Sequence, residues 1–191
     1  MSDAPRLAFF ATAIGECALA WNAVGLTGVW LPATRPGALR QRLARHPANG
    51  NVATPPSSIM AVIDAITRLL AGAHVDLREV PLDLAPIGDF RRRVYAVTRD
   101  IAAGRVLTYG AVAERVGADA SARAVGQALG ANPFPIVVPC HRVVATTGGL
   151  GGFSAPGGVA MKRRMLAIED ARLDGPPDLF DEAQAPASGR P

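Results

Sequence analysis

The chain has 191 residues, of which 49% are hydrophobic and 19% charged, and this globular composition excludes a chain that is disordered throughout. Twenty Lys and Arg against sixteen Asp and Glu give a net charge of +4, and only Lys162 is a lysine. Residues 89–168 hold eleven of the basic residues and four acids, so we expect a polyanion to bind this middle part.

Two cysteines, Cys17 and Cys140, are too few for a disulfide framework or a four-cysteine zinc site. We therefore expect a reducing compartment, no metal and no cofactor. The N-terminal residues lack the pattern of a secretory signal, and no window is apolar enough to span a bilayer. These features predict a soluble cytoplasmic protein that does not bind membranes.

The first third of the chain alternates between apolar and polar residues over positions 7–11, 17–21 and 29–31, which predicts an antiparallel meander. An apolar stripe from Ile59 to Leu70 predicts a helix, capped by Ser57 or Ser58, that covers one face of the sheet. We expect a further strand over residues 75–80. The connector that follows marks the end of an N-terminal α/β domain, residues 1–88.

The second part begins with a helix for which Asp89 is the expected cap. Two short helices, 109–116 and 121–129, then have the outline of a helix-turn-helix. Small residues on the second helix would let it approach a nucleic-acid backbone, and Arg123 could enter a groove or the base stack. Two core helices with a solvated arginine also fit this outline.

The segment 132–144 reads as a buried apolar strand with three prolines, and a Gly-rich loop and a helix of about a dozen residues follow it. The fold class is therefore α+β: an N-terminal antiparallel sheet with a helix, and a mainly helical C-terminal domain, residues 89–170. The acidic, Pro-containing tail, residues 171–191, is expected to be disordered.

Cys140 is the cysteine that has a histidine beside it, in the sequence Pro-Cys-His-Arg. Its thiolate is the reactive form, and His141 could take the thiol proton. Neighbouring residues of a strand point to opposite faces, so we expect a turn and a bridging water at this place. The alternative is that Cys140 is a small buried hydrophobic residue.

Glu169 lies on the inward side of the last helix, since Met161, Met165 and Ile168 form an apolar stripe there. An inward carboxylate needs a partner, and His141 is the natural candidate, because a carboxylate stabilises the imidazolium that forms when a thiol is deprotonated. The alternative places Glu169 in solvent at a frayed helix end.

Several ordered motifs carry a resemblance to a known family: Thr-Tyr-Gly from residue 108, Ser-Ala-Arg-Ala-Val-Gly from 121, Asn-Pro from 132, Pro-Cys-His-Arg-Val from 139 and Gly-Phe-Ser from 152. Over about residues 89–170 the chain resembles the O6-alkylguanine-DNA alkyltransferases, or methylated-DNA–protein-cysteine methyltransferases. The resemblance implies an RNase H-like fold for the N-terminal domain, and it favours a chemical role for Cys140.

The resemblance also implies roles for individual residues. Cys140 would accept the alkyl group, and His141 and Glu169 would form the water-mediated relay that activates it. Asn132 would brace the active-site turn, and Tyr109 would donate a hydrogen bond to the guanine ring nitrogen.

Arg123 would fill the gap left by an extruded nucleotide. The other DNA-contacting residues would be Tyr109, Ser121, Ala122, Ala124 and Gly126. The pocket walls would come from Leu129, Val143, Phe153 and Ser154, the last of these near the guanine oxygen.

These features predict a monomeric DNA-repair enzyme that binds double-stranded DNA containing O6-alkylguanine, flips the base out and transfers its alkyl group irreversibly to Cys140. A non-catalytic protein that binds the same lesion is the main alternative. A Cys-His-Glu hydrolase and a plain DNA-binding regulator are two further ones.

Overall fold

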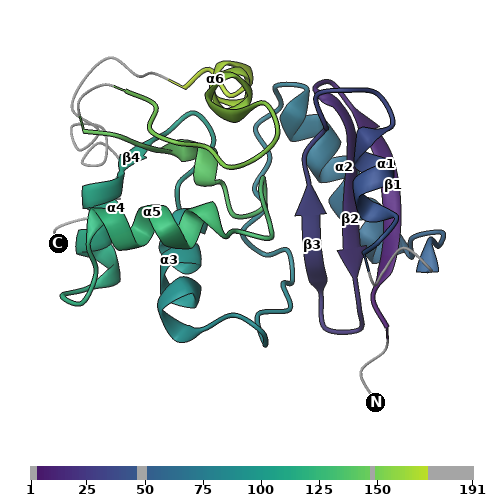
Figure 1. The fold of residues 1–191 in the computed structure, drawn as a ribbon, viewed down its shortest axis with the longest axis horizontal. Coiled ribbons are helices and arrows are strands. Elements are labelled where there is room, and N and C mark those ends of the chain that lie inside the picture. The colour runs from purple at the N-terminus through teal and green to yellow at the C-terminus, as the bar shows by residue number, and fades with distance from the viewer. Residues whose placement is uncertain (1–3, 47–50, 147–148, 172–191) are drawn as a thin grey trace, which may run out of the picture.

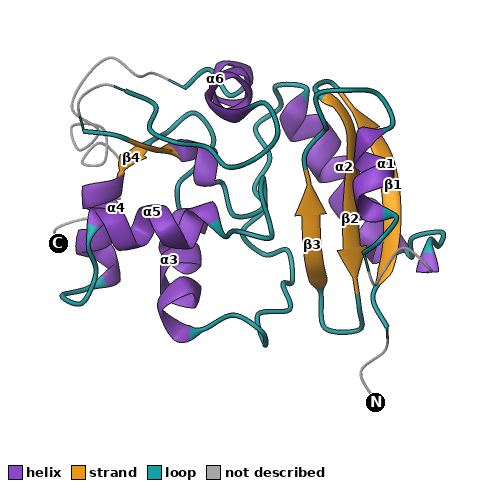
Figure 2. Cartoon of the chain, in the orientation of Figure 1, coloured by secondary structure: helices purple, strands orange, loops and turns teal. Residues whose placement is uncertain are grey.

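The structure is a computed structural model that describes residues 4–46, 51–146 and 149–171. A three-stranded sheet with its helices forms one side of the molecule, and helices α3, α4 and α5 form the other (Figure 1). Helix α6 lies at the top of the view, between the two sides, as the distribution of helices and strands in Figure 2 also shows. The chain is thus a mixed α/β structure with a small antiparallel sheet.

The predicted meander is confirmed. Strands β1 (Arg6–Thr12), β2 (Gly15–Trp21) and β3 (Leu26–Trp30) pair antiparallel in the order β1-β2-β3. Ala18 of β2 lies opposite Phe9 on one side and Trp30 on the other. Period-two alternation therefore identified the strands and their order correctly.

Both faces of this sheet are covered. On one face, Ala18 and Ala20 of β2 pack with Leu39 and Leu43 of the short helix α1 (Ala38–Leu43). The alternate residues of β2 face the main core, which contains the apolar stripe of α2 (Ser57–Leu70). The predicted helix on one face is therefore confirmed, and α1 was missed because a six-residue helix carries too few turns to show a period.

The expected capping residues of two helices are wrong by one or two positions. Pro56 stands at the N-cap of α2, so neither Ser57 nor Ser58 caps it. Gly88 stands at the N-cap of α3 (Asp89–Arg99), and Asp89 lies in its first turn. There its negative charge still complements the helix dipole.

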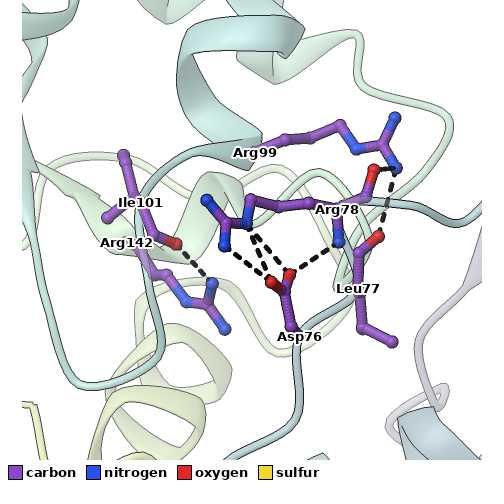
Figure 3. Close-up of polar contacts among 6 residues, drawn as sticks. All are labelled: Asp76, Leu77, Arg78, Arg99, Ile101 and Arg142. Carbon is purple, nitrogen blue, oxygen red and sulfur yellow. Dashed lines mark hydrogen bonds and ion pairs between the residues drawn. The ribbon is translucent and has the colours of Figure 1, made fainter.

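The strand expected over residues 75–80 is also wrong. This segment is an irregular connector whose carbonyl groups accept hydrogen bonds from one side chain, that of Arg99 at the end of α3. Nη2 of Arg99 donates to the carbonyl oxygens of Leu77, at 3.1 Å, and of Arg78 (Figure 3). The same nitrogen also donates to the carbonyl of Val80 at 2.8 Å. Nη2 carries two hydrogens, which the three carbonyl oxygens share, and this one side chain stands where a neighbouring strand would supply a ladder.

The connector then joins the edge of β3. Leu26 donates its N–H to the carbonyl of Pro81 at 2.9 Å, and its own carbonyl accepts from the N–H of Asp83 at 2.8 Å. The main hydrophobic cluster continues across this junction, since it contains Trp21 and Leu26 together with Val94 and Tyr95 of α3. The sheet and the helical part thus share one core.

The helical part holds the elements that form the site. After α3 the order is β4 (Leu107–Thr108), α4 (Tyr109–Val116), α5 (Ala122–Gly130), a 3₁₀ turn (Cys140–Arg142), β5 (Val143–Val144) and α6 (Gly158–Ile168). Thr108 and Ser121 cap α4 and α5 by accepting the N–H groups of Ala111 and Ala124. The predicted helices at 109–116 and 121–129 and the last helix are confirmed to within a few residues.

No helix within the described ranges is long and apolar enough to cross a membrane. The tail was predicted to be disordered, and its residues after 171 lie outside the described residues.

The contact between the β2–β3 turn and the connector predicts the effect of one added methyl group. A Cβ atom at Gly25 would lie 2.5 Å from the carbonyl oxygen of Pro81, so we expect Gly25→Ala to lower the stability by about 1–3 kcal/mol through overpacking. Chemical denaturation measures this change. Gly130→Ala is the matched control, because a Cβ there meets open space. Equal destabilisation by both substitutions would contradict the prediction.

Candidate active site

Cys140 lies in a turn and not in the apolar strand that was predicted over residues 132–144. The chain turns through residues 133–139, and Cys140–Arg142 form one turn of 3₁₀ helix. Only Val143–Val144 are extended, and this short β5 pairs parallel with β4, Leu107 opposite Val143. The expected turn at Cys140 is therefore present, and the pairing of β4 with β5 brings Tyr109 close to the cysteine in space.

Asn132 holds the turn together. Its Nδ2 donates to the carbonyl of Val138 at 2.9 Å, and its Oδ1 accepts the N–H of Phe134 at the same distance. Within the turn Ile136 has φ of 77°, a left-handed conformation that costs a β-branched residue about 1–3 kcal/mol. The side chain of Ile136 is buried in the core, so packing around it compensates for the strain.

Cys140 borders a cavity of about 460 Å³. It is 9% exposed. The other lining residues come from α4, α5 and the loop before α6: Tyr109, Ala122, Gly126, Leu129, Gly130, Gly152, Phe153 and Ser154. Val143, predicted as a pocket wall, is not among them, because it is fully buried in β5 and supports the site from behind.

Tyr109 forms a wall of the cavity and is packed closely by the loop opposite. Gly151 has φ of +67°, and a Cβ there would lie 2.8 Å from Cε2 of the tyrosine ring. The Tyr109 hydroxyl donates to the carbonyl of Gly152 at 3.4 Å. Burial, and then the nearby Cys140, raise the pKa of Tyr109. The phenol therefore stays protonated at neutral pH and remains a hydrogen-bond donor.

The sulfur of Cys140 is a thiol at rest. Burial raises its pKa above the ordinary value, and the hydrogen bond from Asn132 and the charge of Lys162 lower it by less. The surroundings therefore do not produce a standing thiolate at neutral pH. A thiol in this state becomes a nucleophile only when a base removes its proton.

His141 and Glu169 are in contact, as the helix spacing predicted. Nε2 of the buried His141 lies 3.0 Å from Oε1 of the buried Glu169. Hydrogen bonds from His141 and Arg142 outweigh burial and lower the pKa of Glu169 to about 2, so this carboxylate accepts and cannot donate. Nε2 must then carry the proton, and Nδ1 of the neutral imidazole is the basic nitrogen.

Nδ1 is buried and has no hydrogen-bond partner among the residues that the structure describes. Burial lowers the pKa of His141 below its ordinary value, and the contact with Glu169 only partly offsets this. The imidazole is therefore neutral at pH 7 and can accept a proton at Nδ1.

Two charged residues of the site, Arg142 and Lys162, had no role assigned from the sequence. Arg142 donates from Nε and Nη2 to the two carboxylate oxygens of Glu169, at 2.9 and 2.8 Å. Lys162 is fully buried and donates from Nζ to the carbonyl of Val143 at 2.5 Å, and burial lowers its pKa to about 8. Lys162, Met165, Leu166 and Glu169 form the buried stripe of α6, and their spacing of three, four and seven residues is a signal that could have identified the lysine.

Helix α5 presents its small residues to the cavity. Ala122 and Gly126 line it, and a Cβ at Gly126 would lie 3.8 Å from the Tyr109 ring. Arg123 is exposed, and Ala124 is half-buried. The hydroxyl of Ser121 is occupied as the helix cap, and the hydroxyl of Ser154 donates to the carbonyl of Gly130 at 2.9 Å. Of the sequence-predicted residues on this helix, Ala122, Gly126 and Leu129 line the cavity, and Ser121, Arg123 and Ala124 do not.

Comparison with known proteins places these features in a family. Residues 89–171 match the family described as 6-O-methylguanine DNA methyltransferase, DNA binding domain. The chain is 41% identical to the methylated-DNA–protein-cysteine methyltransferase of Methanothermobacter thermautotrophicus, over 65% of this chain and 69% of that protein. It is 36% identical to the enzyme of the same name from Mycobacterium bovis, over 71% of this chain and 80% of that protein.

Solved structures of related proteins superpose on most of this chain. Mycobacterium tuberculosis OGT in complex with DNA superposes with a TM-score of 0.67 and 31% identity, over 88% of this chain and 96% of that one. The O6-methylguanine-DNA methyltransferase of Pyrococcus kodakaraensis superposes with a TM-score of 0.63 and 30% identity, over 86% of this chain and 98% of that one. With a cysteine at the wall of a cavity and a histidine–glutamate pair behind it, the chain belongs to the family of methylated-DNA–protein-cysteine methyltransferases.

Proposed function

We propose that this enzyme repairs O6-alkylguanine in double-stranded DNA by moving the alkyl group to Cys140, once per molecule. The observation that carries the proposal is the position of Cys140, which borders a cavity of about 460 Å³ between Tyr109 and the loop of Phe153 and Ser154. A base inside a duplex cannot reach such a sulfur, so the nucleotide has to be extruded into the cavity first.

The reaction starts with the thiol proton. It passes through a water to Nδ1 of His141, and Glu169 stabilises the imidazolium that forms. The sulfur then attacks the alkyl carbon in line, the S–C bond forms, and the bond from that carbon to O6 breaks. The electron pair leaves with guanine as its O6 anion, and the Tyr109 hydroxyl donates a hydrogen bond to the ring as this charge develops. Ser154 lies near the guanine oxygen.

The product is a thioether. Neither water nor a base easily removes the alkyl group from its sulfur, so each protein molecule reacts once. Asn132 holds the sulfur in place during the transfer, and its contacts to Val138 and Phe134 support this role. Leu129 and Phe153 supply the apolar sides of the pocket.

DNA binding is assigned to α4 and α5 as a helix-turn-helix within a C-terminal domain, residues 89–170. The small residues Ala122, Ala124 and Gly126 let α5 approach the backbone, Ser121 and Tyr109 lie at its edge, and the exposed Arg123 fills the space of the extruded nucleotide. The N-terminal domain, residues 1–88, has an RNase H-like sheet and supports the C-terminal one. The enzyme acts as a monomer, and its affinity falls with salt.

The alternative of a non-catalytic lesion-binding protein is disfavoured by the cysteine and its histidine–glutamate pair, since binding alone needs neither. A Cys-His-Glu hydrolase would release its product and turn over repeatedly.

Intact mass spectrometry tests the central proposal. After mixing with a duplex that contains O6-methylguanine, the protein should gain one methyl group on Cys140, in an amount equal to the protein and no more. Cys140→Ser should gain none, because the alcohol is a far weaker nucleophile. Methyl release into solution with continued turnover would contradict the proposal and favour the hydrolase.

The pH dependence follows from the state of His141. Because burial lowers its pKa below 6.5, more than half of the imidazole is neutral at pH 6.5, and the midpoint of the fall in single-turnover rate should lie below this pH. Rapid-quench measurements at constant ionic strength from pH 4.5 to 8 give the midpoint. A midpoint above 6.5 would show that His141 is not the base or is not buried as described.

Arg123 should affect the rate of methyl transfer only when the base has to leave a duplex. We expect Arg123→Ala to slow methyl transfer from duplex DNA about tenfold, which corresponds to about 1.4 kcal/mol of the cost of extrusion. Transfer from free O6-methylguanine base should keep its rate. Arg42→Ala removes the same charge from the exposed face of α1 and serves as control. Equal losses on both substrates would assign Arg123 to the chemistry instead.

A further inference from the structure

The carboxylate of Glu169 has two partners, and only one of them takes part in the proposed reaction. Oε1 accepts from Nε2 of His141 and from Nη2 of Arg142, and Oε2 accepts from Nε of Arg142. All three side chains are buried, with 4% of the Glu169 side chain and 7% of that of Arg142 exposed. One negative charge is therefore shared by two groups that are each able to balance it.

The position of Arg142 is fixed by a third contact. Its Nη1 donates to the carbonyl of Ile101 at 2.6 Å, just after the end of α3 (Figure 3). The two-pronged contact with Glu169 and this carbonyl occupy three of the N–H directions of a planar group. Arg142 cannot move away from the carboxylate without leaving the Ile101 carbonyl unpaired in a buried place.

The other charged groups around His141 come from three elements. Lys162 of α6 donates from Nζ to the Val143 carbonyl, and Nζ lies 5.6 Å from the centre of the Tyr109 ring. Asp76 of the connector lies near Arg142, but its carboxylate is held by Arg78 (Figure 3). Burial is the largest cause that lowers the pKa of His141, Glu169 raises this pKa, and the charges of Arg142 and Lys162 lower it further.

Arg142 balances the negative charge of the Glu169 carboxylate. With Arg142 present, the buried Glu169 carboxylate is neutralised without any proton on Nδ1 of His141. Without Arg142 the carboxylate would be buried with the imidazole alone, and the pair would take up a proton to avoid an uncompensated charge. That proton would go to the imidazole, the stronger base of the two.

We propose that Arg142 is a positioning residue that neutralises Glu169 and thereby keeps His141 an unprotonated base, able to accept the proton of the Cys140 thiol. This inference rests on the proposed function of His141. A merely structural ion pair would change stability when broken, but it would leave the titration of the histidine unchanged.

Titration of His141 by ¹⁵N NMR in the full chain tests the proposal without reference to activity. In the unmodified protein at pH 7, Nε2 should carry the proton and Nδ1 should not. In Arg142→Gln the midpoint of His141 should rise by about one pH unit or more, the size expected when a nearby charge is removed. Arg142→Lys keeps the charge and should leave the midpoint near that of the unmodified protein. Arg42→Gln, on the exposed face of α1, should change nothing.

The rate of methyl transfer gives the second measurement. Arg142→Gln should react about two- to fourfold more slowly at pH 7 for a midpoint between 7 and 7.5, since only the neutral imidazole accepts the proton, and it should recover as the pH rises past the new midpoint. A folded Arg142→Gln whose midpoint does not move would overturn the proposal. Should this variant not fold, a protonated Nδ1 in the unmodified protein at pH 7, or a shifted midpoint in Arg142→Lys, would overturn it. Failure of the proposed function is a separate result, since it appears as absence of methyl on Cys140 while the titration still responds to Arg142.

Discussion

A single buried carboxylate joins the parts of the candidate active site. Glu169 follows α6, its partners His141 and Arg142 lie in the 3₁₀ turn, and Arg142 in turn contacts the end of α3 through the Ile101 carbonyl. Removing a carboxylate from water costs several kcal/mol unless it is paired and hydrogen-bonded, so these three segments are stable only when they meet. The need to satisfy one charge therefore determines the relative placement of His141, Arg142 and α6.

The N-terminal sheet contributes to the same arrangement through backbone contacts. The N–H of Val29 in β3 donates to the carbonyl of Pro133 at 2.8 Å, next to Asn132, which braces the turn of Cys140. At the turn between β1 and β2, Nη2 of Arg164 in α6 donates to the carbonyl of Ala13 at 2.7 Å. The sheet thus serves as a support for the turn and for α6, and this explains why its edge β3 is not open to solvent.

Local patterns predicted most of the regular structure and failed where tertiary contacts replace regular hydrogen bonding. The meander, α2, α4 and α5 were found from period and turn residues, since each buries a face of its own. Residues 75–80 look like a strand, but their carbonyls bond to Arg99, and a side chain of a distant helix has no signature in the connector itself. Similarly, the prolines of 132–144 bend an apolar segment that composition alone reads as extended.

For the site, the sequence by itself determined the cysteine, its neighbouring histidine and the inward face of Glu169, because adjacency and helical spacing are local properties. Only the tertiary structure decided that the thiol is protonated at rest, that Arg142 shares the carboxylate, that Lys162 is buried and that Val143 stands behind the cavity instead of in its wall. The physical reason is that pKa and burial depend on groups far away in the chain. These groups are brought together by the pairing of β4 with β5 and by the contact of α6 with Val143.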